Sequence, residues 1–491
     1  MRSTLPAALL VCVIGVFYVA TLREGHVWGD DQAAYIAHAR NIAEGRSYGE
    51  IGYVRSPSSI NPQMYPPGYP LLLAPVYHFS GPALTPMKVM NIGFFCAALF
   101  IFYLLVRDYG QPLALATVAV IGACPYFWDF KDTVASEFPF LALAYGALLV
   151  GHYAGIKDRR RRSQLLLGAA AGVLCGLAYA TRNVALVLPP AICLANFVTT
   201  RRMTLFSVLT VIAFAGIAGC QKLLFDLQSD YLTPLLQILS VRTLMGSPWY
   251  YCKCLATPWD NGYSSAGQML LYAALVAFAL RGAWLRCRQP WTGVEFFSLF
   301  YLALIVLFPW GGRRYLIPVM PVFVLYALVG IRALAAPRAV AGLPESHANN
   351  RSGGKLAFVL PSTIALAVLA TFVLKYSTLP WHAIPGGIRT PGFTELVAYL
   401  GQPRGGTAPV VFGKARLLAL AAGIPAADGF KADTPRLELD YYQQIGASRF
   451  IVQQDGDEPA NTLLRTFVTD HPGNFTPDKR IGTFHVLKFT R

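Results

Sequence analysis

Residues 5–31 read LPAALLVCVIGVFYVATLREGHVWGDD, an apolar run that is followed closely by two adjacent aspartates. The run Leu5–Leu22 has about the length that a helix needs to cross the core of a bilayer. Only Arg2 precedes it and no A-x-A cleavage site follows it, so we expect an uncleaved first span. The whole chain is 55% hydrophobic and 13% charged, whereas soluble proteins carry about 25% charged residues. The sequence therefore predicts an α-helical polytopic membrane protein.

Apolar runs of similar length recur along the chain as far as residue 374. We predict about 11 transmembrane helices. They lie near Leu5–Leu22, Thr85–Val106, Pro112–Tyr126, Phe138–Ala154, Leu165–Thr181, Val184–Val198, Thr204–Cys220, Ala266–Leu280, Val294–Phe308, Tyr315–Ile331 and Leu356–Leu374. Two of these runs contain closely spaced prolines, at Pro189–Pro190 and Pro318–Pro321, so we expect these two helices to be broken or tilted.

The formal net charge of +16 has two interpretations, a nucleic-acid-binding protein or a membrane protein with basic cytoplasmic loops. If the N-terminus is cytoplasmic, the cytoplasmic loops together carry +13, with the largest share in residues 157–162. The first 48 residues of the first outer loop, 23–70, have four basic and five acidic residues. This distribution follows the positive-inside rule. Because the positive charge is dispersed over loops, it argues against a nucleic-acid partner.

The composition changes after residue 375, and the organisation that we predict has two parts. Residues 1–375 form the transmembrane domain, with a first outer loop at 23–84, a second at 127–137 and a long one at 221–265. Residues 376–491 contain twelve basic and ten acidic residues and no spanning run. Short helices and strands alternate there, at Phe393–Leu400, Pro409–Phe412, Ala415–Ala422, Asp440–Ile445, Arg449–Gln453 and Thr483–Lys488. This alternation predicts a small, soluble, extracytoplasmic α/β domain.

The first outer loop holds the residue pair that is the strongest candidate for catalysis, Asp30 and Asp31. Apolar residues at helical spacing follow the pair and Gly45 ends the pattern, so Asp30 is placed to cap a helix. A second interpretation is catalytic. A carboxylate next to apolar surroundings can have a raised pKa, and transfer of a sugar to a hydroxyl or amine needs a base for the acceptor's proton.

The string Gly-Asp-Asp-x-x-x-Tyr-x-x-x-Ala-Arg-x-x-x-x-Gly, residues 29–45, resembles GT-C superfold glycosyltransferases. These are protein O-mannosyltransferases, aminoarabinose transferases and bacterial Rgt-like membrane glycosyltransferases. The resemblance implies a GT-C-like catalytic domain that moves a sugar from a polyprenyl-phosphate donor to a lipid, glycan or protein acceptor. It places the catalytic base on Asp30, with Asp31, which stands where the family usually has Glu, as the alternative base.

Two further segments resemble the family. The end of the first outer loop, Tyr65-Pro66-Pro67-Gly68-Tyr69-Pro70, is similar to the family's Pro-Pro segment, with Tyr65 where members often have a phosphate-binding Lys. The second outer loop resembles the acidic loop that positions the donor phosphate, in some members through a divalent cation. Glu137 matches best and Asp132 second. Lys131 is a candidate for a phosphate contact, with a place at the membrane interface as the alternative. The alternative for Glu137 is a helix cap.

Three arginines complete the predicted donor site. Arg182 lies between two apolar runs, where a charge is costly unless it is used or reaches the surface. Arg313 and Arg314 lie on the outer side, contrary to the positive-inside pattern, and are therefore candidates for an anionic ligand such as the donor phosphate. The histidines share no metal-ligand spacing, so Glu137 and Asp132 are the only residues that we consider for a metal.

Other functions for such a chain stay open at this point. A lipid-linked sugar flippase would place charges deep inside spans and would show related repeats. A surface-polysaccharide polymerase or ligase would use a different donor, and a membrane scaffold would have no catalysis. We expect the inner (plasma) membrane of a bacterium, with chemistry on the outer face and membrane lipids around the spans.

Overall fold

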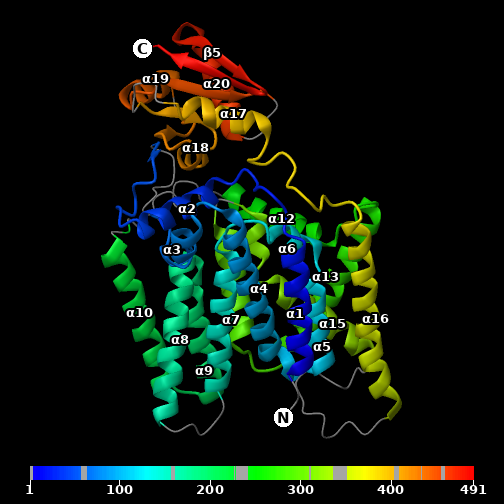
Figure 1. Cartoon of the computed structure of the whole chain (residues 1–491). Helices are drawn as coiled ribbons and strands as arrows, with labels where there is room; N and C mark the ends of the chain where they lie inside the picture. Colours follow the sequence, from blue (N-terminus) through cyan, green and yellow to red (C-terminus); the bar gives the residue numbers. More distant parts are fainter. Residues whose placement is uncertain are drawn as a thin grey trace.

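The structure is a computed structural model of the whole chain. It describes residues 4–56, 64–155, 161–225, 227, 241–308, 311–335, 351–402, 408–432, 434–454 and 459–490, and at 241–244 and 351–358 the backbone only. The chain forms a long helical bundle with a smaller domain at one end (Figure 1). The N-terminus lies at the opposite end of the bundle from this domain.

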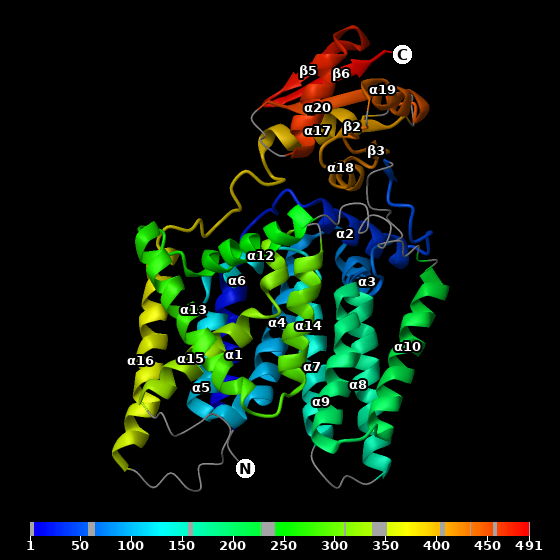
Figure 2. The ribbon, with the colours of Figure 1, turned by 180° about the vertical axis from the view of Figure 1, so that it is seen from behind.

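The bundle is built by helices that coincide with the apolar runs of the sequence, together with shorter helices at the end near the C-terminal domain (Figure 2). They are α1 (Leu5–Ala20), α2 (Asp30–Ala43), α3 (Gly68–Ser80), α4 (Leu84–Val106), α5 (Gln111–Gly122), α6 (Pro125–Phe130), α7 (Glu137–Ala154), α8 (Arg161–Thr181), α9 (Leu188–Thr200), α10 (Leu205–Phe225), α12 (Val241–Ala256), α13 (Ser265–Cys287), α14 (Gly293–Leu307), α15 (Met320–Ala335) and α16 (Arg351–Tyr376).

Six helical stretches of the described chain are long and apolar enough to cross a membrane. They are Leu84–Tyr109, Arg161–Thr181, Asn183–Thr200, Leu205–Phe225, Ser265–Cys287 and Val359–Tyr376. Four shorter apolar helices, α1, α5, α14 and α15, accompany them. The chain is therefore a multi-pass membrane protein, and the number of 11 spans stays a prediction. The breaks expected at the prolines are present, because 3-10 turns at Asn183–Val187 and Arg313–Leu316 precede α9 and α15.

Small residues allow close packing of the helices at specific places. α13 and α15 cross at Gly282 and Gly330, where a Cβ added to Gly282 would come within 2.0 Å of the Tyr326 carbonyl oxygen. α3 approaches α8 in the same way, because a Cβ on Gly68 would lie 2.6 Å from the backbone of Ala180. This second contact brings the end of the first outer loop against the end of α8, next to Arg182.

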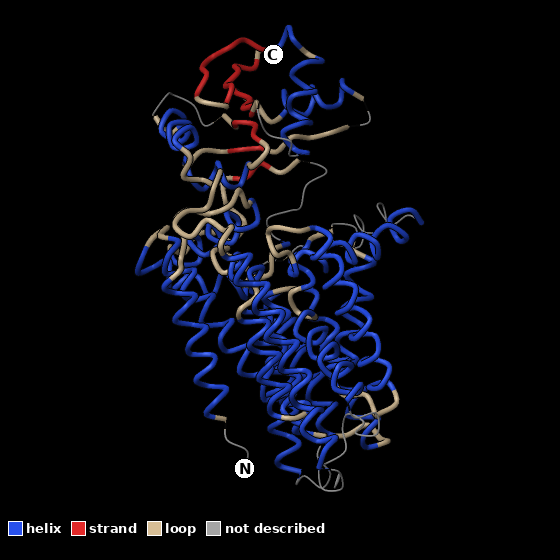
Figure 3. The backbone as a smooth tube through the Cα atoms, turned by 90° about the vertical axis from the view of Figure 1, so that its right-hand side faces the viewer, coloured by secondary structure: helices blue, strands red, loops and turns tan. Residues whose placement is uncertain are grey.

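The C-terminal domain contains a six-stranded sheet with the order β1-β3-β2-β4-β6-β5. Its strands are β1 (Tyr53–Val54), β2 (Val410–Phe412), β3 (Ala426–Ala427), β4 (Arg449–Gln453), β5 (Phe475–Ile481) and β6 (Phe484–Phe489). The first four in this order are parallel, while β6 and β5 are antiparallel to their neighbours. Figure 3 shows the strands gathered at the C-terminal end of the molecule, beyond the helical bundle.

The edge strand β1 comes from the first outer loop, although the sequence analysis places that loop in the transmembrane part. Tyr53 pairs with Ala426 and Val54 with Ala427. Gly52 precedes the strand with φ of 74°, and a Cβ there would lie 3.3 Å from that of Ala419. The first outer loop thus contributes a strand to the C-terminal sheet.

Helices cover both faces of this sheet, and alternate strand residues point to opposite sides. Val410 and Phe412 belong to a core with α17 (Pro391–Leu400) and α18 (Ala415–Ala422). Val411 and Phe450 belong to a second core, with α19 (Pro435–Gln444) and α20 (Pro459–Asp470).

The first of these cores also includes residues of α2, among them Ala34 and Ile36. α2 lies between the bundle and the C-terminal domain in both Figure 1 and Figure 2. Because each fully buried large apolar side chain contributes roughly 1.5–3 kcal/mol, the shared core holds α18 against α2. β3, β5 and α20 are elements that the sequence analysis does not predict.

Candidate functional site

The acid pair lies in the first turn of α2, at the end of the bundle that faces the C-terminal domain. The expectation that Asp30 caps its own helix is wrong, because Gly29 is the N-cap residue and Asp30 is the first helical residue. Instead, Asp30 Oδ1 accepts a hydrogen bond from the backbone N–H of Leu417, 3.1 Å away. Leu417 lies in the first turn of α18, whose N–H groups have no partner within the helix. Asp30 therefore caps a helix of the C-terminal domain.

Asp31 is held by residues from three other segments. Tyr65 donates to its Oδ1 at 2.6 Å, and Arg314 donates to its Oδ2. Arg416 of α18 lies 3.5 Å from the same Oδ1. The site thus includes Tyr65 and Arg314, two residues that are predicted from the sequence, and it adds Arg416, which is not.

Glu137 lies on the other side of Arg314. Its Oε1 is 3.4 Å from Arg314 Nε and 2.5 Å from Arg182 Nη1. Its Oε2 is buried and has no hydrogen-bond partner among the residues that the structure describes. α7 begins at Glu137 with Ser136 as N-cap residue and no side-chain cap. Glu137 thus pairs with two arginines and makes no side-chain cap on α7, and its contact with a donor stays a prediction.

These contacts form a chain of alternating charges, which we call the arginine–carboxylate chain: Arg416, Asp31, Arg314, Glu137 and Arg182. Its members come from α18, α2, the turn before α15, α7 and the end of α8, so five separate segments meet in one site. Three guanidinium groups and two carboxylates leave a surplus of one positive charge within the chain, and Asp30 beside it offsets this charge when ionised.

The two aspartates have opposite pKa shifts. Burial raises the pKa of Asp30 to about 6, and Asp428 and Asp31 add to this, while Arg416 and the Leu417 N–H oppose it. Burial alone would also raise the pKa of Asp31, but Arg314, Arg416 and the Tyr65 hydroxyl outweigh it and lower the pKa to about 2. Asp30 therefore titrates near neutral pH while Asp31 stays ionised, and a general base is most effective with a pKa near the working pH.

The structure places Lys131 and Asp132 in a different cluster. Asp132 accepts from Arg23 Nε at 2.7 Å and from Lys131 Nζ at 2.8 Å, and Lys88 Nζ lies 3.7 Å away. Lys131 also lies over the ring of Trp128, 4.0 Å from its centroid. All of these charged groups are buried. The cluster ties the start of the first outer loop to the second one, and the predicted contact of Lys131 and Asp132 with a phosphate stays a prediction.

Arg313, in contrast to Arg314, is exposed. The described part of the chain contains no group of three His, Cys, Asp or Glu residues that could hold a metal ion. In particular, the Asp132 oxygens already face Arg23 and Lys131. Glu137 is thus the remaining residue of the two that we considered for a metal.

Sequence reasoning misses Arg416. The helix that contains it reads ARLLALAA, with a single charge among apolar residues. An isolated arginine in a helix that otherwise buries its side chains is a signal that could have identified it. Its partners could not have been identified in this way, because they lie more than 100 residues away in the chain.

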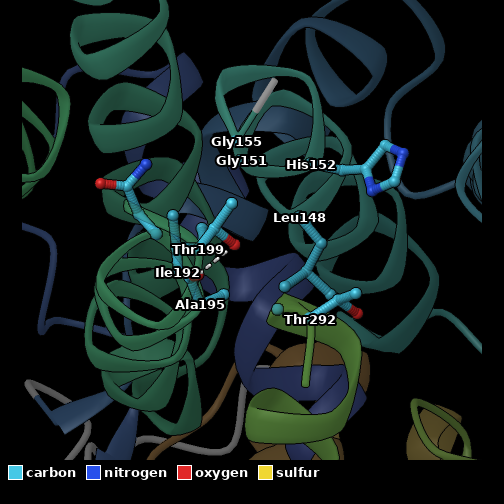
Figure 4. A pocket seen from close by; sticks show the side chains of 10 residues that line it. Leu148, Gly151, His152, Gly155, Ile192, Ala195, Thr199 and Thr292 are labelled. Carbon is cyan, nitrogen blue, oxygen red and sulfur yellow. Dashed lines mark hydrogen bonds between the residues drawn. The ribbon is translucent and has the colours of Figure 1, made fainter. Parts of the chain in front are cut away.

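A cavity of about 230 Å³ lies elsewhere, between α7, α9 and α14 (Figure 4). It is lined by Leu148, Gly151, His152, Gly155, Ile192, Ala195, Asn196, Thr199, Thr292 and Gly293. His152 lies fifteen residues beyond Glu137 on α7, which corresponds to roughly 22 Å along a helix. The cavity is therefore separate from the acid pair.

Comparison with known proteins identifies the fold. No family model matches the sequence, and no curated protein matches it significantly. ArnT from Cupriavidus metallidurans, bound to undecaprenyl phosphate, superposes with a TM-score of 0.58 at 13% identity over 99% of this chain and 98% of that chain. The Archaeoglobus fulgidus oligosaccharyltransferase in complex with Zn and sulfate gives 0.59 at 11% identity over 91% and 68%.

Arabinofuranosyltransferase AftD from Mycobacteria gives a TM-score of 0.57 at 13% identity, over 100% of this chain and 42% of that chain. All three neighbours are glycosyltransferases of the GT-C fold. The predicted GT-C-like fold is confirmed, and this chain is a membrane protein of the GT-C fold.

Proposed function

We propose that this chain is a glycosyltransferase that moves a sugar from a polyprenyl-phosphate donor to an acceptor outside the cytoplasm. The proposal rests chiefly on one observation, which is that Asp30 adjoins the arginine–carboxylate chain, of which Asp31 is a member, at one end of the bundle. The fold supports it, because ArnT of this fold has been solved with undecaprenyl phosphate and the oligosaccharyltransferase AglB with a dolichol-phosphate.

In the proposed reaction the acceptor hydroxyl or amine attacks the anomeric carbon of the donor sugar. The bond between that carbon and the phosphate oxygen breaks, and the phosphate leaves with the electron pair. Asp30 takes the acceptor's proton, since its raised pKa suits a base near neutral pH. A base on the face opposite the leaving group gives inversion at the anomeric carbon.

The arginines provide the binding energy for the phosphate. Arg314 and Arg182 each present a planar guanidinium group, which matches the geometry of phosphate oxygens. Arg313, exposed next to Arg314, adds a third cation at the rim. Asp31 and Glu137 hold Arg314 in place before the donor arrives. The developing negative charge on the leaving phosphate is then stabilised by groups that need little rearrangement.

The proposed orientation puts the N-terminus in the cytoplasm and the acid pair with the C-terminal domain on the outer face of a bacterial inner membrane. It is supported by the positions of the N-terminus and the C-terminal domain at opposite ends of the bundle (Figure 1). The sequence also supports this orientation. Its basic segments lie between apolar runs that are joined at the end of the bundle where the N-terminus lies, as the positive-inside rule expects of a cytoplasmic side. Cysteine labelling from each side of oriented membranes tests this orientation.

The decisive experiment incubates the purified full chain with a panel of polyprenyl-phosphate sugars and with lipid, glycan and peptide acceptors. Mass spectrometry identifies any product, and Asp30→Asn is the matched control. Transfer by the natural chain with loss in the variant supports the proposal. Movement of labelled donor across liposomes without transfer would instead indicate a flippase, and activity restricted to pyrophosphate-linked oligosaccharides would indicate a polymerase or ligase.

A further inference from the structure

Arg416, in the first turn of α18, lies at the point where the C-terminal domain meets the acid pair. Its Nη1 is 3.4 Å from Asp30 Oδ2, 3.5 Å from Asp31 Oδ1 and 2.7 Å from the Tyr65 hydroxyl oxygen. The guanidinium also lies over the Tyr53 ring, 4.7 Å from its centroid. One side chain of the C-terminal domain therefore contacts both carboxylates and the tyrosine that donates to Asp31.

The position of Arg416 is unusual for a residue whose only task is to hold two domains together. Its side chain is 7% exposed, and burial of an arginine is costly unless its charge is paired. The apolar core shared by α2 and α18 already holds the two elements together. An apolar residue at position 416 would extend that core without a desolvation cost, so the charge itself points to a role in the site.

We propose that Arg416 is a positioning residue, through which docking of the C-terminal domain holds Asp30 and Asp31 in the arrangement required for sugar transfer. This inference rests on the proposed function and extends it, because it makes the C-terminal domain part of the reaction site. Arg416 acts through the carboxylates. Its guanidinium and the Leu417 N–H, both on α18, fix the orientation of Asp30, and its contact with Tyr65 fixes the hydroxyl that holds Asp31.

The electrostatic consequence concerns Asp30. Four groups face it: Arg416 and the Leu417 N–H from α18, Asp428 after β3, and Asp31 on its own helix. The first two favour the ionised carboxylate, and the two acids disfavour it. Asp428 is itself held by the Tyr53 hydroxyl. Without the positive charge at position 416 the acids prevail, so Asp30 takes up its proton at a higher pH and fewer molecules have an active base.

The test compares Arg416→Met, Arg416→Lys and a control, Arg449→Gln. The control removes another arginine of the same domain, one that pairs with Asp478 at 2.9 Å and does not contact the acid pair. Transfer is measured as kcat and KM over a range of pH. We expect Arg416→Met to lower kcat more than it raises the KM for the donor, and to move the acid limb of the pH profile upward by about one unit or more. Arg416→Lys restores much of that limb, and Arg449→Gln leaves it unchanged.

A second readout does not depend on turnover. Carbodiimide modifies protonated carboxyl groups, and mass spectrometry of the Asp30 peptide gives the pH midpoint of its labelling in each full-length variant. A higher midpoint in Arg416→Met but not in Arg449→Gln supports the inference. If Arg416→Met changes neither the labelling midpoint nor the pH profile, the inference about Arg416 is overturned while the proposed function stands. If the natural chain transfers sugar from no donor but the midpoint still shifts in Arg416→Met, the proposed function is overturned and the coupling between Arg416 and Asp30 stands.

Discussion

Arg314 donates to Asp31 across 283 residues of sequence, and the same guanidinium lies 3.4 Å from Glu137. The contact joins the first outer loop to the turn before α15 and to the start of α7. It gives the site a cation that is shared by two carboxylates. Because Arg314 is the cation that joins Asp31 to Glu137, its loss would break the arginine–carboxylate chain in the middle.

Replacement of Arg314 by Met tests this dependence. We expect a destabilisation of about 2 kcal/mol, since a partly buried ion pair loses its shared cation, together with a higher KM for the donor. Arg314→Lys keeps the charge but lacks the planar guanidinium group that contacts Asp31 and Glu137 at once. It should therefore recover only part of the lost stability and donor binding. Arg313→Met is the comparison: it removes an exposed cation at the rim, so it should leave stability unchanged and raise the KM for the donor less than Arg314→Met does. A larger rise in KM for Arg313→Met would move the main phosphate contact to Arg313.

Asp30→Asn separates the two roles of Asp30. Asparagine still accepts a hydrogen bond from the Leu417 N–H, so the cap on α18 is retained, but it cannot serve as a base. We expect transfer to fall by roughly 100-fold or more, with thermal stability in detergent close to that of the natural chain. Asp30→Ala should lose both the transfer activity and the cap on α18. If Asp30→Asn transfers sugar at the natural rate, the base assignment is wrong and only the cap remains.

The pH dependence of transfer follows from the pKa of Asp30. Since only the ionised form accepts a proton, the rate should fall as the pH drops below about 6. Initial rates between pH 4.5 and 8.5, roughly the range in which such a base titrates, provide the measurement. A rate that is unchanged down to the ordinary pKa range of aspartate would show that Asp30 does not carry the proton.

Stability should depend on pH in opposite directions for the two aspartates. The folded-state pKa of Asp30 is raised, so folding favours its protonated form and this group adds stability as the pH falls from about 6. Asp31 has a lowered pKa, so its contribution is present above its ordinary pKa and is lost as the pH falls toward about 2. Thermal unfolding of Asp30→Asn and Asp31→Asn across this pH range separates the two contributions. Identical profiles of stability against pH for the two variants would contradict the opposite directions expected here.

The hydroxyl of Tyr65 links Asp31 and Arg416, and Tyr65→Phe removes this link alone. We expect a loss of about 1–3 kcal/mol, because buried groups are left without a partner, and a reduced transfer rate. Tyr69→Phe is the control, since its hydroxyl bonds with Asn91 instead of the acid pair. This control should lose stability but keep the pH profile. Equal effects on transfer from both substitutions would mean that the Tyr65 hydroxyl only supports the fold.

Gly68→Ala tests the close approach of α3 to α8. The new Cβ would lie 2.6 Å from the Ala180 backbone, so the helices must separate, at a cost of about 1–3 kcal/mol. Transfer should also fall, because Arg182 directly follows α8. Gly93→Ala, in α4, has open space around the new Cβ and should be neutral or stabilising. Thermal unfolding and transfer rates of the pair provide the measurement, and equal stability for both variants would refute the contact.

Much of the fold could be predicted from the sequence because its signals are local. The apolar runs predict the helices of the bundle, since a helix in a bilayer must satisfy its own backbone and needs a fixed length of apolar residues. Gly45 follows the C-terminal end of α2 with a positive φ of 66°, as its position after the helical pattern predicts. The weak and short β3, by contrast, has no alternating pattern that a sequence could reveal.

For the candidate site, the residue types can be read from the sequence alone: an acid pair after a first apolar run, an acidic second loop, and arginines on the side where the charge rule does not expect them. Which of these groups meet became visible only in the folded chain. It united Asp31, Glu137, Arg182 and Arg314, placed Lys131 and Asp132 in another cluster, and brought Arg416 to the acid pair. The difference arises because these interactions act over different distances along the chain. Apolar length and helix periodicity act within one segment. Ion pairing and burial join segments whose separation in sequence carries no information about their distance in space.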